Sequence, residues 1–97
     1  MDIEQELTGK KGAFFVADDG TRLAELLFFR SAPDLITIYH TEVNEKLRGK
    51  GAGADMVAAA VKYAHENGLK IVAECPYAKK MIERNPEFRS ILAESEI

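Results

Sequence analysis

The sequence lacks the residue patterns on which several classes of protein depend. Its single cysteine, Cys75, excludes an internal disulfide bond. No group of Cys and His residues has the spacing of a metal centre, so no metal is expected. The longest apolar stretches are short and interrupted by charges, and the acidic residues 1–6 lack the apolar core of a secretory signal. These absences predict a cytoplasmic protein without a membrane partner.

The composition is typical of a single globular domain over residues 1–97, with 46% hydrophobic and 30% charged residues. The net charge of −3 argues against a general attraction to nucleic acid. Against this acidic background, the basic residues Lys46, Arg48 and Lys50 stand out in one loop. Three basic residues without an aromatic stripe beside them are too few for a nucleic-acid interface, so no nucleic-acid partner is expected.

The first half of the sequence carries the signals of extended chain. An apolar run at residues 12–17 ends at Asp18-Asp19-Gly20, which is a strong turn signal, and a second run follows at residues 21–30. These two runs predict an antiparallel hairpin. Residues 35–43 are rich in β-branched and aromatic side chains and place apolar residues on both faces, as in a central strand. The large apolar side chains assigned to the core are Phe14, Phe15, Leu26, Phe28 and Phe88.

The second half begins with a helical pattern. Gly68 is placed to end this helix, residues 70–74 form a short strand, and residues 76–84 form a second helix that opens with proline. Residues 93–97 are expected to fray, and no pattern decides the conformation of residues 1–11. The order β-β-β-α-β-α predicts an α+β sheet with two helices and a right-handed parallel crossover. The apolar residues at helical spacing are Met56, Val57, Ala60, Val61 and Ala64.

The loop Arg48-Gly49-Lys50-Gly51-Ala52-Gly53 lies between the predicted central strand and the long helix. Its three glycines let the backbone curl tightly with amide groups turned inward. The helix that follows adds unpaired N–H groups and the positive end of its dipole. The loop therefore predicts a phosphate or pyrophosphate site, to which Arg48 and Lys50 add charged contacts. Its glycine spacing fits neither the Walker loop nor the dinucleotide fingerprint.

The pattern Arg48-x-x-Gly51-x-Gly53 resembles the acyl-CoA pyrophosphate loop of the GNAT superfamily. The runs 40–43, 75–77 and 85–88 extend the resemblance to small, stand-alone GNAT-like domains, over about residues 35–90. The resemblance implies a minimal GNAT-like fold in which the two parallel strands flanking the long helix splay apart around acetyl-CoA. It implies that backbone groups of Glu42 and Val43 hold the pantetheine arm. The residues implied for the pyrophosphate are Arg48, Gly49, Lys50, Gly51, Ala52, Gly53 and Ala54.

Cys75 is the first candidate catalytic residue. Many GNAT enzymes follow the second splayed strand with Asn-x-x-Ala-x-x-x-Tyr, in which the tyrosine is a general acid, but this sequence has Cys75-x-x-Ala78-x-x-x-Ile82. Cys75 precedes Pro76 at a predicted helix start, where free N–H groups favour a thiolate. It is interpreted as a nucleophile that takes the acetyl group or as a residue that positions the thioester. The alternative is a small buried residue without a chemical role.

His40 is the second candidate, at the end of the first splayed strand. It is placed to act as general base for an acceptor amine or to deprotonate Cys75 across the cleft, with Glu42 as an alternative base. The structural alternative is a histidine that bonds a neighbouring element. Tyr77 either covers the pantetheine or the acceptor site, or packs on the sheet. The function predicted from these residues is acetyl transfer from acetyl-CoA to an unidentified small nucleophile, and the alternative is a non-catalytic CoA-binding module. The acceptor and the oligomeric state do not follow from the sequence.

Overall fold

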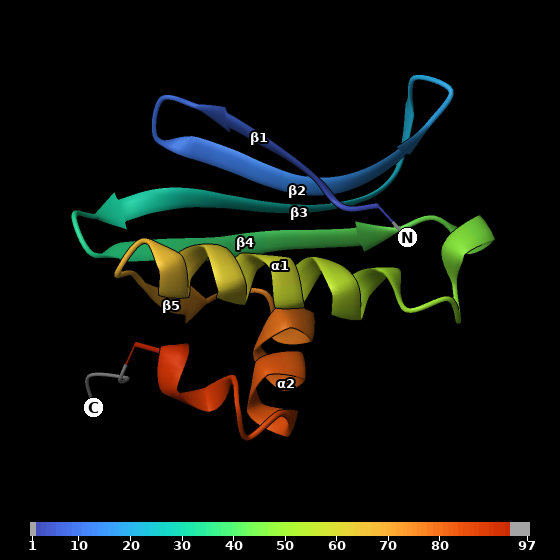
Figure 1. The fold of residues 1–97 in the computed structure, drawn as a ribbon. Coiled ribbons are helices and arrows are strands. Elements are labelled where there is room, and N and C mark those ends of the chain that lie inside the picture. Colours follow the sequence, from blue (N-terminus) through green and yellow to red (C-terminus); the bar gives the residue numbers. More distant parts are fainter. Residues whose placement is uncertain (1, 94–97) are drawn as a thin grey trace.

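Five strands form one mixed sheet in the order β1-β2-β3-β4-β5, in a computed structural model that describes residues 2–93 (Figure 1). The first four strands are antiparallel neighbours, and β5 lies parallel to β4. The strands span Glu4–Thr8, Lys11–Asp18, Thr21–Ala32, Leu35–Val43 and Lys70–Ala73. The helices are α1, Ala52–Glu66, and α2, Pro76–Arg84, and the short 3₁₀ turns are η1, Glu45–Leu47, and η2, Arg89–Ile91.

The predicted hairpin is the one that joins β2 and β3. Asp18 pairs with Thr21, and the two residues between them, Asp19 and Gly20, have φ angles of 54° and 83°. Two successive positive φ angles are typical of a type I′ turn, whose twist matches that of the strands it joins. The predicted β-β-β-α-β-α order is confirmed, and both helices end within a residue or two of the predicted positions.

The edge strand β1 was not predicted. All five of its residues are exposed, so it has no alternation of apolar and polar residues that the sequence could reveal. It pairs with β2 through a tight turn at Gly9, whose φ angle is 61°. At the other end of the chain, the N–H of Ala93 donates to the carbonyl of Ile71 at 2.8 Å, so the expected fraying does not begin at residue 93. Residues 94–97, the rest of that prediction, lie outside the described residues.

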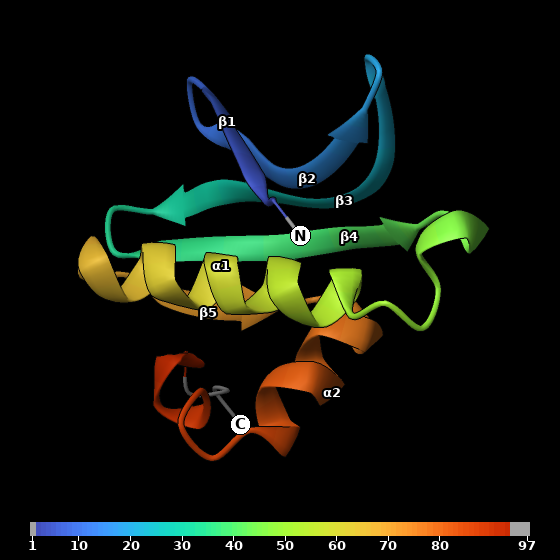
Figure 2. The same ribbon diagram turned by 45° about the vertical axis from the view of Figure 1, so that its right-hand side comes forward.

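The core lies between α1 and the face of the sheet that this helix covers (Figure 2). The predicted apolar stripe of α1 is buried, and it packs over Phe14, Leu26 and Phe28 from β2 and β3. The rings of Phe14 and Phe28 stack with centroids 5.5 Å apart, and Tyr63 of α1 packs against both. The assignment of Phe15 to this core was wrong, because alternation along β2 turns its side chain to the other face.

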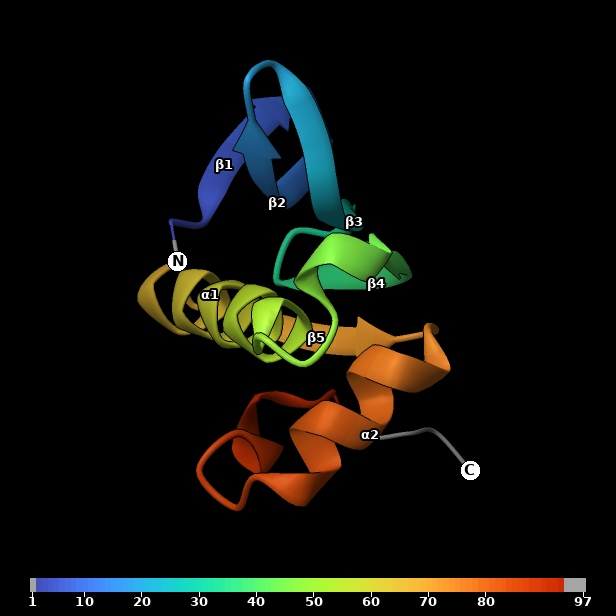
Figure 3. The ribbon, with the colours of Figure 1, turned by 90° about the vertical axis from the view of Figure 1, so that its right-hand side faces the viewer.

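The other face of strands β1 to β4, which we call the outer face, carries no helix within the described part of the chain (Figure 3). Cross-strand pairing brings Phe15, Glu25 and Glu42 into one row there, and Glu6, Leu27 and His40 into the next. No helix among residues 2–93 is long and apolar enough to cross a membrane. The two faces of the sheet therefore differ, with an apolar core on one side and a surface of mixed charged and apolar side chains on the other.

Candidate active-site groove

Strands β4 and β5 run side by side for four residue pairs and then separate. The last pair joins Ile38 to Ala73, and the carbonyl of Ile38 accepts bonds from the N–H groups of Glu74, at 2.9 Å, and Cys75, at 3.2 Å. The chain then turns into α2, whereas β4 continues to Val43. Within the described residues, β4 has no strand partner on this side beyond Ile38. The predicted splay of the two parallel strands is therefore confirmed.

A β-bulge decides which residues of β4 face this opening. Leu27 pairs with His40 and Phe28 with Ile38, so Tyr39 is an extra residue without an opposite partner. Strict alternation from the buried Ile38 would turn His40 toward α1. The extra residue reverses that alternation, and Thr41, which pairs with the buried Leu26, lies on the α1 side instead.

A groove of about 560 Å³ lies between the end of β4, the N-terminus of α1 and α2, and Cys75 itself does not line it. Its volume lies in the range of small-molecule and cofactor sites. Of the residues implied for acetyl-CoA, Glu42 and Lys50 do not line it. Four lining residues, Thr41, Leu47, Tyr77 and Met81, were not among them. The implied residues that do line the groove are Val43, Arg48, Gly49, Gly51, Ala52, Gly53 and Ala54.

Glycine is required at these positions of the loop for two different structural reasons. Gly49 and Gly51 have φ angles of 77° and 82°, in the left-handed region that other residues avoid, and Gly51 caps α1. Gly53 has an ordinary helical conformation, but a Cβ atom there would collide with the hydroxyl group of Tyr77. The absence of a side chain at Gly53 thus allows the Tyr77 hydroxyl group to lie against the first turn of α1. Tyr77 remains 42% exposed and forms one wall of the groove.

Cys75 lies at the N-cap of α2 and is only 8% exposed. Its thiol donates to the hydroxyl oxygen of Thr41, with Sγ and Oγ1 3.4 Å apart. Burial acts to raise the pKa of this thiol, but hydrogen bonds from the Thr41 side chain and from backbone groups of Ala78, Tyr77 and Thr41 favour the thiolate. The net effect is a pKa below the ordinary value of a thiol. This agrees with the thiolate expected at a helix start.

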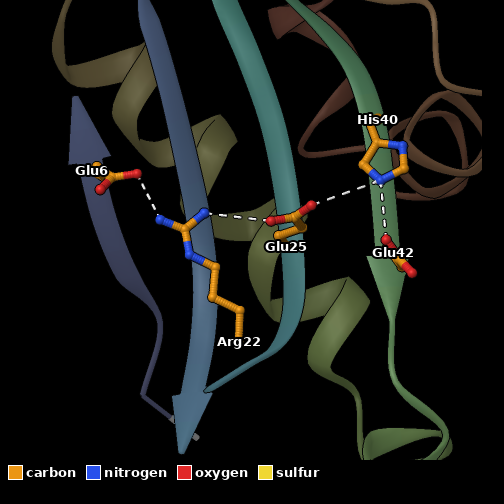
Figure 4. Close-up of polar contacts among 5 residues, drawn as sticks. All are labelled: Glu6, Arg22, Glu25, His40 and Glu42. Atoms are coloured by element: carbon orange, nitrogen blue, oxygen red, sulfur yellow. Dashed lines mark hydrogen bonds and ion pairs between the residues drawn. The ribbon is translucent and has the colours of Figure 1, made fainter. Parts of the chain in front are cut away.

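His40 lies on the outer face, where its Nε2 is 3.4 Å from Glu42 Oε1 and 3.9 Å from Glu25 Oε2 (Figure 4). The structure does not bring it to Cys75, because the neighbouring Thr41 is the residue that contacts the sulfur and successive side chains of a strand point to opposite faces. The hypothesis that His40 deprotonates Cys75 across the cleft is therefore not supported by this geometry. Neither Thr41 nor Glu25 was identified from the sequence, since their importance depends on the bulge and on cross-strand pairing.

The family model described as GCN5-related N-acetyl-transferase matches residues 13–91. The chain belongs to the GCN5-related N-acetyltransferases, the GNAT family. Protein NATD1 of Gallus gallus is 31% identical over 85 residues, which cover 87% of this chain and 77% of that protein. The solution structure of a GCN5-like protein from Staphylococcus aureus is similar with a TM-score of 0.72 and 32% identity, covering 96% of this chain and 90% of that one.

More distant GNAT structures share the fold. The ribosomal-protein-alanine N-acetyltransferase of Brucella melitensis has a TM-score of 0.66 at 19% identity, covering 93% of this chain and 67% of that one. The resemblance found in the sequence and the minimal GNAT fold are thus confirmed. GNAT enzymes use acetyl-CoA and an acceptor, so membership of the family supports acyl transfer by this chain.

Proposed function

We propose that this GNAT domain moves the acetyl group of acetyl-CoA to a small nucleophile by way of Cys75. The observation that carries the proposal is the position of the Cys75 sulfur, 3.4 Å from Thr41, a residue that lines the 560 Å³ groove. A thiol with a lowered pKa at this point has the chemistry of an acyl-accepting nucleophile.

The donor would occupy the groove, with its pyrophosphate at the loop of residues 48–54. The left-handed glycines and the first turn of α1 present N–H groups there, and the guanidinium of Arg48 adds a charged donor. Lys50 lies outside the groove lining and would contribute mainly through its charge. Backbone groups of Val43 would hold the pantetheine arm. The open side of β4 beyond Ile38 supports the assignment of Val43, whose backbone groups face no neighbouring strand. The N–H of Asn44 donates to the carbonyl of Leu23 in β3, so the backbone groups of Glu42, two residues earlier, point to β3.

The proposed chemistry is a thioester exchange followed by transfer. The Cys75 thiolate attacks the acetyl carbonyl, a bond forms from Sγ to the carbonyl carbon, and the bond from that carbon to the CoA sulfur breaks. A free backbone N–H group on the open edge of β4, such as that of Val43, would stabilise the negative charge that develops on the carbonyl oxygen. The acceptor then attacks the acetylated Cys75 and releases its thiolate. Direct transfer, in which Cys75 only positions the thioester, uses the same groove.

His40 and Glu42 remain candidates for the proton of the acceptor. Both side chains lie on the outer face, so they would serve an acceptor amine that reaches the fork from that side rather than serve Cys75. In this arrangement, the donor and the acceptor meet from opposite faces of the sheet. His40 Nε2 would take the amine proton as the new bond to the acetyl carbon forms.

A non-catalytic CoA-binding module is the second candidate function. It is favoured by the residue at the position where many GNAT enzymes have a tyrosine acid, because Ile82 is fully buried in the core and has no proton to give. Such a module would bind acetyl-CoA in the same groove without consuming it.

Intact-mass measurement during an acetyl-CoA titration separates these functions. We expect the wild type to gain one acetyl group and Cys75→Ala to gain none while still binding acetyl-CoA. Direct transfer predicts turnover without acetylation of the protein. Binding of acetyl-CoA with no turnover and no acetylation would replace the proposal by the binding module.

A further inference from the structure

Three potential metal ligands converge on the outer face, and the acetyl-CoA groove uses none of their side chains. Glu25 comes from β3, and His40 and Glu42 come from β4. One ligand atom from each, an imidazole nitrogen and two carboxylate oxygens, lies within 4.8 Å of the other two. We call these three residues the ligand tripod. Figure 4 shows the side chains turned toward one another in front of the strands.

The sheet fixes the tripod through its register. Glu42 pairs directly with Glu25 across the ladder, and His40 lies two residues from Glu42 on the same face. The bulge at Tyr39 is what turns His40 and Glu42 outward together. Two ligands at positions i and i+2 of one strand, with a third from its neighbour, form a triangle on a rigid support. Sites on strands hold their geometry better than sites on loops.

The distances suit a small transition-metal ion. Bonds of 2.0–2.2 Å from Zn²⁺ to nitrogen and oxygen imply about 3.4 Å between neighbouring ligand atoms in a tetrahedral site. His40 Nε2 is 3.4 Å from Glu42 Oε1 and 3.9 Å from Glu25 Oε2. Small rotations of exposed side chains would close the remaining difference. We propose that the ligand tripod binds a divalent transition-metal ion of the Zn²⁺ type, with water in the remaining coordination positions.

The ligand chemistry selects among metal ions. Imidazole nitrogen suits Zn²⁺ and Co²⁺ well, whereas Mg²⁺ and Ca²⁺ prefer oxygen ligands alone. Two carboxylates balance the charge of a divalent ion. A hollow of about 180 Å³ lined in part by Glu25 and Glu42 leaves room for the water ligands. Because His40 and Glu42 are 44% and 71% exposed, we expect a reversible site rather than a permanently loaded one.

Arg22 orients the carboxylate of Glu25 toward the tripod. Its guanidinium nitrogen Nη1 donates to Glu25 Oε1 at 3.4 Å, which leaves Oε2 directed at His40. The guanidinium is itself held by Glu6 Oε1 at 2.6 Å and stacks over Phe15, with its central carbon 3.9 Å from the ring centroid. Groups that hold a ligand in position in this way raise the affinity of metal sites.

The metal site and the proposed acetyl transfer both use one atom, His40 Nε2. A metal ion on His40 Nε2 takes the lone pair that a general base needs, so metal binding and proton removal by His40 exclude each other. Metal binding itself does not depend on the proposed function, because the tripod and the acetyl-CoA groove lie on opposite sides of β4. The two proposals therefore fail separately.

Calorimetric titration of the 97-residue chain with ZnCl₂ tests the site directly. We expect one Zn²⁺ ion to bind per chain, and we expect no comparable binding of Mg²⁺. Co²⁺ should bind at the same site, where the absorption spectrum of the complex reports its coordination. Loss of an outer-shell partner costs metal sites about 10–100-fold in affinity, so His40→Ala, Glu25→Gln and Glu42→Gln should each weaken Zn²⁺ binding at least about tenfold. Far-ultraviolet circular dichroism checks that each variant is folded.

Two control variants make the titration specific. His65 is exposed on α1, and His65→Ala should bind Zn²⁺ as the wild type does. Cys75→Ser should also retain binding, because the sulfur lies on the other side of β4. The proposal is overturned if the wild type shows no saturable binding, if folded His40→Ala binds as tightly as the wild type, or if removal of the Cys75 thiol abolishes binding.

Discussion

The hydroxyl oxygen of Thr41 lies 3.4 Å from the sulfur of Cys75, although 34 positions separate the two residues in the sequence. This contact spans the fork between β4 and the start of α2. It connects Thr41, which the bulge turns toward the groove, with Cys75, which carries the single thiol of the chain. Four tests follow from this contact and from the loop beside it.

The first test replaces Thr41 with valine, which keeps the shape and removes the hydroxyl. Cys75 has a lowered pKa, so its thiolate population rises with pH and reaches one half below the ordinary pKa of a thiol. Without the Thr41 hydrogen bond that pKa should rise, and alkylation by iodoacetamide near neutral pH should slow several-fold. Thr37→Val is the matched control, since Thr37 lies on the same strand as Thr41 but donates to Ser31 of β3. Equal pH profiles for Thr41→Val and the wild type would contradict this account of the thiol.

The second test concerns Gly51, whose left-handed conformation has open space around it. Gly51→Ala should cost about 1–2 kcal/mol in the free energy of unfolding, because a Cβ strains a φ angle of 82°. It should also weaken acetyl-CoA binding, since the loop would relax away from the shape that holds the pyrophosphate. Gly20→Ala introduces the same strain at a φ of 83° in a turn that does not line the groove. Calorimetry should find that only Gly51→Ala loses affinity; equal affinities would refute the loop assignment.

The third test concerns the contact between Gly53 and Tyr77. Gly53→Ala should displace the partly exposed Tyr77 ring, because the new methyl group meets its hydroxyl, and should thereby lose at least part of the ~1 kcal/mol that alanine otherwise gains over glycine inside a helix. Adding Tyr77→Ala should recover part of that loss, which urea unfolding can measure as a double-mutant cycle. Strictly additive effects would show that the two residues do not press on each other. This contact, rather than the pyrophosphate alone, explains why position 53 excludes a side chain.

The fourth test compares the two basic residues of the loop. Arg48 lines the groove and Lys50 does not. Arg48→Ala should therefore cost about 1–3 kcal/mol of acetyl-CoA binding free energy, as loss of a charge-assisted hydrogen bond does. Lys50→Ala should cost less, and its effect should shrink further in high salt because it acts through charge alone. A larger loss for Lys50→Ala, measured by calorimetry at two salt concentrations, would reverse the proposed roles.

The sequence predicted the parts of the fold that local signals specify. The turn at Asp19 and Gly20, the left-handed loop glycines and the helical period of α1 are each set by neighbours within a few residues. The position of the groove could also be predicted, because the loop lies between a strand and the start of a helix. The edge strand β1 was missed because all its residues are exposed and only its pairing with β2 defines it.

The prediction that His40 lies close enough to deprotonate Cys75 was not supported, for a different reason. The sequence gives no sign that Tyr39 is a bulge, because the residues around it are equally suited to a regular strand. One unpaired residue exchanged the positions of His40 and Thr41 between the two faces. The ligand tripod was invisible for a related reason, since Glu25 is 15 residues or more from its partners and meets them only through the register of β3 and β4.

The bulge at Tyr39 sets the face of the sheet to which each later side chain of β4 points. Deletion of Tyr39 would remove the bulge and leave the later residues on their present faces. A slip of β4 into strict alternation with Tyr39 kept would instead turn the imidazole of His40 and the carboxylate of Glu42 into the groove, while the Thr41 hydroxyl and the Val43 side chain would turn to solvent. The thiol of Cys75 would lose its partner, and the ligand tripod would come apart in the same event. Both surfaces of the strand thus depend on Tyr39 staying outside the ladder, where its ring packs beside Phe29 with centroids 5.7 Å apart.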